Sequence, residues 1–185
     1  MNKLNNNIAI VLLLLHFGLY SQSNNRAIAR QGQVSFFSYT SVENIEASNN
    51  QVLSIIDQQN GKVAVRVLLR AFVFKKALME EHFNESYVES DIYPELIFDG
   101  KLMDYDLSNL GDSPQFIKGT MDFHGVKKEI EIKTNVAVTN KKIVLSGDFE
   151  VAIDDFKIKV PALLVPNISK EIQVKFRFEY SPYEK

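Results

Sequence analysis

The chain has 185 residues, of which 45% are hydrophobic and 24% charged, with a formal net charge of −2 and no cysteine. Apolar content this high and net charge this low exclude an intrinsically disordered chain, and the length predicts one domain with a core of its own. Because the sequence has no basic block, we expect no nucleic-acid partner. The absence of cysteine excludes disulfides and thiolate metal sites.

Residues 1–23 are predicted to be a signal peptide that is cleaved. An apolar run at residues 8–15 follows a basic residue and precedes a serine-containing stretch at 21–23, which is the order of a secretory signal. A membrane-spanning anchor would need about 20 apolar residues, whereas His16 interrupts this run. We therefore expect an exported domain at residues 24–185, periplasmic or secreted, without a stable membrane anchor.

Alternation of polar and apolar residues with a period of two predicts strands along most of the remaining chain. The alternation is uninterrupted over residues 171–180, where one face carries Ile172, Val174, Phe176, Phe178 and Tyr180. The same pattern occupies residues 62–74, 95–102, 116–123, 129–138 and 142–153, and turn residues separate these runs. Short strands at this spacing predict an all-β antiparallel meander, either closed as a barrel or folded as a sandwich.

One hairpin can be predicted to the residue. If His124 and Gly125 form a two-residue turn, the apolar positions of both strands fall on one face. The resulting pairs are Phe123 with Val126, Gly119 with Ile130 and Ile117 with Ile132. A slip by one residue would turn the isoleucines toward solvent, so the hydrophobic pattern itself specifies this register.

The segment at residues 75–91 breaks the alternation. Leu78, Met79 and Phe83 are spaced as on one side of a helix, with charged residues between them. This predicts a short amphipathic helix near residues 76–84 that covers an end of the barrel. Pro94 disfavours helix at the residue before it and marks the start of the next strand.

Two motifs in this region are similar to a known family. Residues 82–102 read HFNESYVESDIYPELIFDGKL, a helix leading into a Tyr-Pro strand start, and residues 119–132 read GTMDFHGVKKEIEI, the hairpin described above. Together they resemble the YceI-like family, and the likeness extends over residues 31–180. Two segments differ from the usual family pattern: the first strand, residues 33–39, has no histidine, and residues 156–161 replace a glycine-containing segment.

The resemblance implies an exported, lipocalin-like antiparallel β-barrel of about eight strands with a long apolar cavity. It also implies a ligand, a polyisoprenoid or a related long-chain amphiphile. The expected lining is aromatic and aliphatic: Phe37, Phe72, Phe74, Leu78, Met79, Phe83, Phe98, Met121, Phe123, Phe149, Phe176 and Phe178. For any single one of these side chains, plain core packing is the favoured interpretation, because small barrels often fill themselves.

Three glycines share the inward parity of these residues. Gly100, Gly119 and Gly147 either leave room for a ligand or allow the strands to bend.

Residues for catalysis or metal binding are few. Beyond residue 23 the only histidines are His82 and His124, and they do not have the spacing of a metal motif. We expect His124 to serve the hairpin turn and His82 to cap the helix or contact the cavity mouth. No nucleophile elbow or phosphate-binding glycine loop occurs, so we predict a protein that is not an enzyme and has no cofactor or metal.

Two functions remain open. The first is a carrier that holds an isoprenoid or another long-chain lipid in the barrel for transport or storage. The second is a secreted structural or interaction protein with a filled barrel, whose outer loops, such as residues 104–114, make the contacts. The volume of the cavity distinguishes them.

Overall fold

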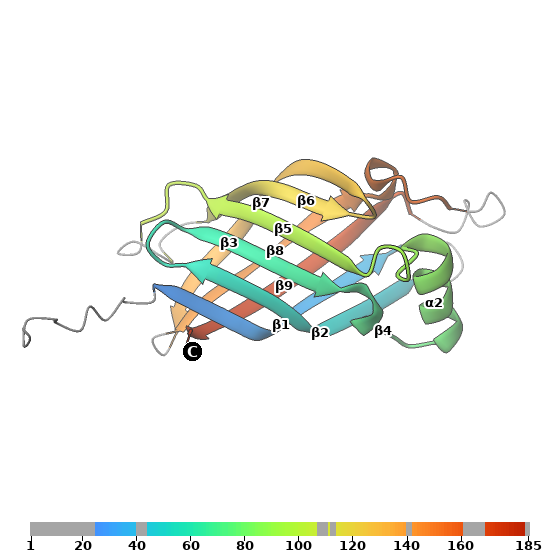
Figure 1. The fold of residues 1–185 in the computed structure, drawn as a ribbon, viewed down its shortest axis with the longest axis horizontal. Coiled ribbons are helices and arrows are strands. Elements are labelled where there is room, and N and C mark those ends of the chain that lie inside the picture. Colours follow the sequence, from blue (N-terminus) through green and yellow to red (C-terminus); the bar gives the residue numbers. More distant parts are fainter. Residues whose placement is uncertain are drawn as a thin grey trace, which may run out of the picture.

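Eight long antiparallel strands close into a barrel in the computed structural model, which describes residues 25–39, 44–106, 111, 114–139, 142–160 and 169–183 (Figure 1). The long strands are β1 (Arg26–Ser38), β2 (Ile45–Asp57), β3 (Lys62–Leu68), β5 (Glu95–Leu102), β6 (Gln115–Phe123), β7 (Val126–Thr139), β8 (Lys142–Ala152) and β9 (Glu171–Pro182). Their order is β1-β9-β8-β7-β6-β5-β3-β2, and β1 also pairs with β2. This last pairing closes the sheet, so the barrel is confirmed and the sandwich is excluded. The predicted export segment, residues 1–23, lies outside the described residues.

The helical elements lie at one end of the barrel, where β3 ends and β5 begins (Figure 1). They are the 3-10 turn η1 (Leu69–Ala71), the helix α2 (Ala77–His82), the π-helical turn η2 (Phe83–Tyr87) and the 3-10 turn η4 (Ile153–Phe156). We call this the helix end. The predicted short helix is confirmed, although it starts at Ala77 and continues as a π-helical turn to Tyr87.

The predicted single strand at residues 62–74 is wrong in its second half. After Leu68 the backbone turns into η1, and the Leu69 amide donates to the Pro94 carbonyl oxygen at 3.0 Å. Pairing resumes only in β4 (Val73–Phe74), which lies against β2. Alternation alone could not reveal this, because Leu69 still faces inward at 2% exposure.

The strand β2 was not predicted, because the residues that it buries are mostly small or polar: Ala47, Asn49, Val52, Ser54 and Ile56. Its pairing with β1 also shifts register twice, between Ala29 and Gly32 and between Gly32 and Val34. Such a bulge changes the parity of the strand. A scan for alternating hydrophobic residues therefore finds no signal here.

The β6–β7 hairpin has the predicted register. Phe123 pairs with Val126, Gly119 with Ile130 and Ile117 with Ile132. His124 and Gly125 connect the strands with φ angles of 52° and 71°. Positive φ at both turn positions is the conformation whose twist matches an antiparallel pair.

The inward-facing glycines make room for the protein's own atoms. A Cβ added at Gly119 would lie 2.3 Å from the Asp99 carbonyl oxygen, across the ladder. At Gly100 it would lie 2.6 Å from the Phe98 ring, and at Gly147 2.9 Å from the Phe176 ring. These glycines therefore let strands approach closely and let aromatic rings lie over them.

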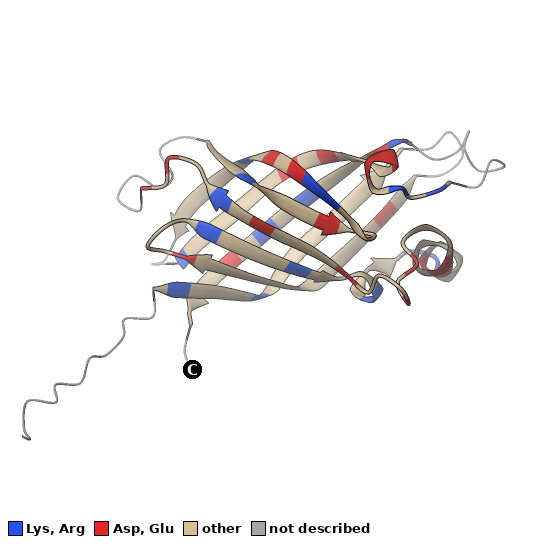
Figure 2. Cartoon of the chain, turned by 45° about the horizontal axis from the view of Figure 1, so that its top comes forward, with Lys and Arg blue, Asp and Glu red and all other residues tan. Residues whose placement is uncertain are grey.

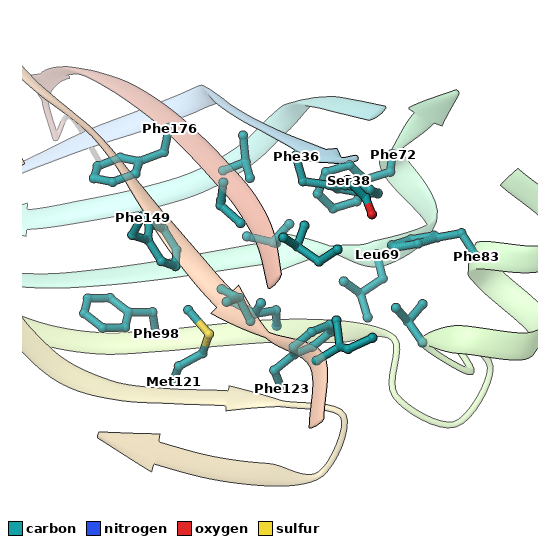
Figure 3. Close-up of a pocket in the computed structure, with 18 of the residues that line it drawn as sticks. Phe36, Ser38, Leu69, Phe72, Phe83, Phe98, Met121, Phe123, Phe149 and Phe176 are labelled. Atoms are coloured by element: carbon teal, nitrogen blue, oxygen red, sulfur yellow. The ribbon is translucent and has the colours of Figure 1, made fainter. Parts of the chain in front are cut away.

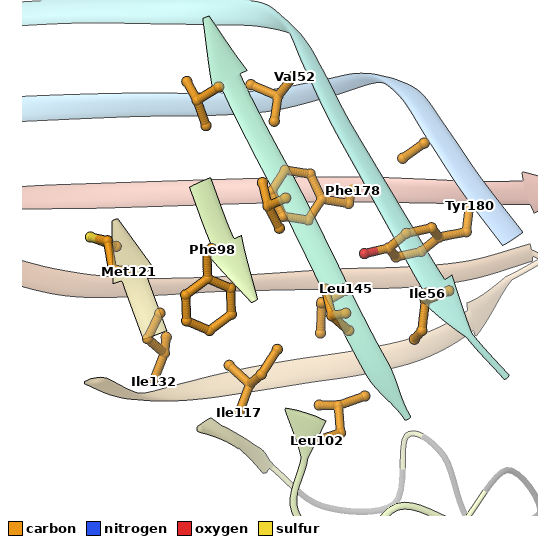
Figure 4. Close-up of a cluster of buried hydrophobic side chains, with 14 of the residues drawn as sticks. Val52, Ile56, Phe98, Leu102, Ile117, Met121, Ile132, Leu145, Phe178 and Tyr180 are labelled. Carbon is orange, nitrogen blue, oxygen red and sulfur yellow. The ribbon is translucent and has the colours of Figure 1, made fainter. Parts of the chain in front are cut away.

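The end opposite the helices is closed by a cluster of buried side chains (Figure 4). Tyr180 is 1% exposed and packs there with Ile56 and Leu102. Its hydroxyl lies 2.7 Å from Ser54 Oγ, which donates in turn to the Ala64 carbonyl oxygen at 3.2 Å. We call this cluster, defined by Ile56, Leu102 and Tyr180, the floor. Burial raises the pKa of Tyr180 far above its ordinary value, and the Ser54 hydrogen bond offsets part of that rise.

The outer face of the barrel carries the charges. Lys and Arg alternate with Asp and Glu along the strands (Figure 2). Lys142 Nζ lies 3.0 Å from Glu179 Oε1, and Lys75 Nζ lies 2.8 Å from Glu46 Oε2. Exposed pairs of this kind add little to stability, but they show which side of each strand faces water.

Candidate functional site

A cavity of about 250 Å³ occupies the barrel between the helix end and the floor (Figure 3). On β3 and η1 it is lined by Val63, Val65, Val67 and Leu69, a stretch of about 20 Å at the ordinary rise of a strand. Among the lining side chains, all except Ser38, His82 and Tyr87 consist only of hydrocarbon or thioether. The cavity is therefore long, narrow and dry.

Four aromatic rings pack together at the helix end of the cavity. Phe36 lies 5.3 Å from Phe72, 5.8 Å from Phe74 and 5.5 Å from Phe83, measured between ring centroids. Phe83 also contacts Phe72 and Phe74, at 5.6 and 5.1 Å. Because Phe83 belongs to η2 and the other rings to the barrel wall, this cluster attaches the helical segment to the barrel.

A second aromatic row lies deeper, along β8 and β9. The ring centroids of Phe149 and Phe176 are 6.2 Å apart, and those of Phe176 and Phe178 are 5.3 Å apart. Phe178 then contacts Tyr180 of the floor at 6.5 Å. Aromatic side chains therefore follow the cavity from its helix end to its closed end.

The structure brings ten of the twelve predicted lining residues to this cavity: Phe72, Phe74, Met79, Phe83, Phe98, Met121, Phe123, Phe149, Phe176 and Phe178. Figure 3 shows how Phe98, Met121, Phe123, Phe149 and Phe176 converge from different strands. Contact of these residues with a ligand stays a prediction.

Phe37 does not line the cavity, which corrects its predicted placement. The register shifts at Gly32 change the alternation of β1, so that Val34, Phe36 and Ser38 face inward instead. Phe37 then belongs to the opposite face of the strand.

Leu78 also does not line the cavity, and its side chain is 60% exposed. Met79, His82 and Phe83 are three and four residues apart and form the side of α2 and η2 that faces the barrel. Leu78 precedes Met79 by one residue and therefore points away from that side. His82, for which we expected either a capping role or a contact at the cavity mouth, is among the lining residues.

Several lining residues were not predicted. Ile172 and Val174 have the same parity as Phe176, so the alternation of β9 already contained them. Ser38 and Ile45 carried no signal, because the bulge in β1 and the polar pattern of β2 hid both positions.

His124 ties three segments together at the helix end. Its Nδ1 lies 3.0 Å from the Phe156 carbonyl oxygen and its Nε2 lies 2.9 Å from Glu89 Oε2. The ring of Tyr93 packs on His124 at 4.5 Å between centroids. We call His124, Glu89, Tyr93 and Phe156 the clasp.

Comparison with known proteins identifies the fold family. The family model of the YceI-like domain matches residues 26–180. The chain belongs to the YceI-like family. The family match thus confirms the resemblance carried by the two motifs, and it also includes the start of β1.

Solved structures share the YceI-like fold at low identity. A polyisoprenoid-binding domain from Saccharophagus degradans, implicated in plant cell wall breakdown, has a TM-score of 0.71 and 15% identity, covering 86% of this chain and 99% of that one. BcnA of Burkholderia cenocepacia has a TM-score of 0.69 and 13% identity, covering 81% of this chain and 96% of that one. The YCEI protein of Campylobacter jejuni has a TM-score of 0.62 and 17% identity, covering 80% of this chain and 90% of that one. Comparison with curated proteins gave no match.

The described part of the YceI-like barrel has neither a membrane-spanning helix nor a group of side chains that could bind a metal ion. In the described part of the chain, every helix is too short or too polar to cross a lipid bilayer. Within the same residues, no three His, Asp or Glu side chains are grouped so that they could hold a metal ion.

Proposed function

We propose that this YceI-like protein is exported and holds a long apolar molecule, a polyisoprenoid or a related amphiphile, in its barrel for transport or storage. The observation that carries the proposal is the cavity of about 250 Å³ with an almost entirely apolar lining. Ligand pockets commonly measure about 300–1,000 Å³, so this volume suits a narrow chain. The polyisoprenoid-binding domain with the same fold supports this class of ligand.

The gain from burying such a ligand is sufficient for tight binding. At about 0.3 kcal/mol per non-hydrogen atom, a ligand of roughly 30 carbons binds with about 9 kcal/mol, which is a sub-micromolar Kd. No charged partner is needed for this affinity. The lining accordingly contains no Lys, Arg, Asp or Glu in the part of the chain that the structure describes.

The other functions find less support. A filled barrel that acts only through its outer loops needs no internal cavity, whereas this barrel has one. An enzyme needs polar groups that converge on a substrate, and the lining offers only Ser38, His82 and Tyr87. We therefore propose a binding protein without chemistry of its own.

The proposal is tested by what the protein retains. The full chain is purified from its native host, extracted with organic solvent and analysed by mass spectrometry. We expect a long-chain lipid in the extract. Val65→Phe, which places a ring into the cavity, should abolish its recovery.

Ala64→Phe is the matched control, because Ala64 is the neighbouring residue and is exposed on the outer face of β3. Both variants are first compared by thermal unfolding, so that loss of lipid is read only from folded protein. If the wild type yields no lipid, or if Val65→Phe and Ala64→Phe retain it equally, the cavity is not the binding site.

A further inference from the structure

Ser38 is an exception in the apolar cavity. It is 2% exposed, it lines the cavity, and its Oγ has no hydrogen-bond partner among the described residues. Figure 3 shows its oxygen among apolar neighbours, beside Phe36 and Phe72. A buried hydroxyl without a partner has lost its water and gained nothing in return.

Three other buried polar side chains of the barrel strands are paired. Ser54 Oγ is bonded to Tyr180, Thr134 Oγ1 donates to the Gln115 carbonyl oxygen at 3.0 Å, and Asn49 Nδ2 donates to the Leu68 carbonyl oxygen at 2.9 Å. Each of these groups serves the fold. Asn84 Oδ1, Ser90 Oγ and Gln115 Oε1 are also buried without a partner among the described residues, but Ser38 is the one of these four residues that lines the cavity, so its natural partner is a ligand atom.

The charges around the cavity limit what that atom can be. Among the described residues, the lining contains no Lys or Arg to neutralise a phosphate or carboxylate, and its titratable groups are His82 and Tyr87. Moving an unpaired anion into such a lining is far more costly than moving a neutral polar group. The group that meets Ser38 is therefore uncharged.

The position of Ser38 sets the orientation of the ligand. Ser38 is the last residue of β1 and pairs with Ile45 at the start of β2, at the helix end. From there the lining continues inward, through Phe149, Phe176 and Phe178, toward the floor. The cavity therefore gives a chain attached to the polar group room toward the floor.

We propose that the cavity binds a neutral amphiphile whose hydroxyl, carbonyl or amide group hydrogen-bonds to Ser38 Oγ at the helix end, with its chain directed toward the floor. This inference rests on the proposed function and narrows its ligand class.

The test compares ligands that differ only in the head group. Hexadecan-1-ol, hexadecane and hexadecyl phosphate each displace the fluorescent probe N-phenyl-1-naphthylamine from delipidated wild type and from Ser38→Ala. We expect Ser38→Ala to weaken the binding of hexadecan-1-ol by about three- to tenfold, which corresponds to the loss of one neutral hydrogen bond. Hexadecane should bind Ser38→Ala as well as the wild type, or more tightly. Hexadecyl phosphate should bind the wild type at least tenfold more weakly than the alcohol.

Two further variants serve as controls. Ser38→Thr keeps a hydroxyl and should keep the preference for the alcohol over the alkane. Ser35→Ala removes a hydroxyl from the same strand at a position outside the cavity lining, and should change neither affinity.

The outcomes separate this inference from the proposed function. If the alcohol and the alkane lose affinity equally in Ser38→Ala, or if the phosphate binds as tightly as the alcohol, the role of Ser38 is overturned while the cavity function stands. If none of the three compounds displaces the probe from the wild type, the proposed function fails and this inference fails with it.

Discussion

Tyr180 shows how a single polar atom is accommodated in the floor. Its ring is almost wholly buried, and its hydroxyl donates to Ser54, which donates onward to the Ala64 carbonyl oxygen. Because the hydroxyls of Tyr180 and Ser54 both have hydrogen-bond partners, the Tyr180 hydroxyl costs little while it stays protonated. An ionised tyrosine at the same position would be a buried charge without a counter-ion.

This difference predicts how stability depends on pH. Above pH 10, the ordinary pKa of tyrosine, unfolding releases the Tyr180 proton, because burial keeps the folded group protonated. The free energy of unfolding should therefore fall as the pH rises, by up to about 1.4 kcal/mol per pH unit from this group. Tyr180→Phe should lose about 1 kcal/mol at neutral pH through the missing hydrogen bond, but should be less sensitive to alkali.

Urea unfolding at several pH values between neutral and about pH 12 measures both quantities. Tyr39→Phe serves as the control, because the side chain of Tyr39 is 70% exposed. Parallel curves for wild type and Tyr180→Phe above pH 10 would contradict the role assigned to burial.

Individual cavity residues could be predicted wherever a strand keeps its alternation. Phe176 and Phe178 follow directly from the pattern of β9, and Phe98 and Met121 from β5 and β6. Phe37 could not be placed, because one bulge at Gly32 reverses the parity and depends on pairing with a strand distant in sequence.

At the level of elements, the clasp holds the connection between η2 and β5 against the hairpin and η4. Glu89 has a positive φ of 46°, and its carboxylate bonds to His124 across 35 residues of sequence. A non-glycine residue in this conformation needs support from its surroundings. The clasp supplies such support and fixes the helical segment over the cavity.

Replacing His124 by Asn tests the clasp without disturbing the hairpin. Asn-Gly is the favoured sequence for this turn, but asparagine is too short to reach both Glu89 and Phe156. We expect His124→Asn to lose about 1–3 kcal/mol of unfolding free energy. Hydrogen exchange should accelerate in residues 83–93 and stay slow in β6 and β7. Unchanged exchange in residues 83–93 would show that the helical segment is held by the phenylalanine cluster alone.

An element can be predicted from the sequence when the residues that determine it are adjacent in the sequence, and not when they are distant. The β6–β7 hairpin is specified by period-two strands and a His-Gly turn that are adjacent in sequence, and its register was predicted correctly. The strand β2 is specified by partners on both sides, and its inward Asn49 and Ser54 become acceptable only through bonds to Leu68 and Ala64. The clasp likewise joins three segments that no local pattern connects.

For the whole molecule, charge and hydrophobicity are divided between the two faces of one closed sheet. Ion pairs such as Lys142–Glu179 and Lys75–Glu46 lie outside, and among the described residues the cavity lining contains no acidic or basic side chain other than His82. The side chains that line the cavity are therefore also part of the hydrophobic core of the barrel.

Export is predicted for the whole chain from residues 1–23. When the full sequence is expressed in its native host, N-terminal sequencing of the exported protein should begin at or near Asn24. A chain lacking residues 2–23 should remain in the cytoplasm. Recovery of the full-length chain with residues 1–23 intact outside the cytoplasm would contradict cleavage.

The floor limits how far a ligand chain could extend into the cavity. Because Tyr180, Ile56 and Leu102 close one end of the barrel, an inserted chain stops at a fixed depth. Any carbons beyond that depth must stay at the helix end, next to the clasp and the phenylalanine cluster. Under the proposed function, we therefore expect a ligand shorter than the cavity to lie wholly inside the barrel, and a longer ligand to keep its remaining carbons at the helix end.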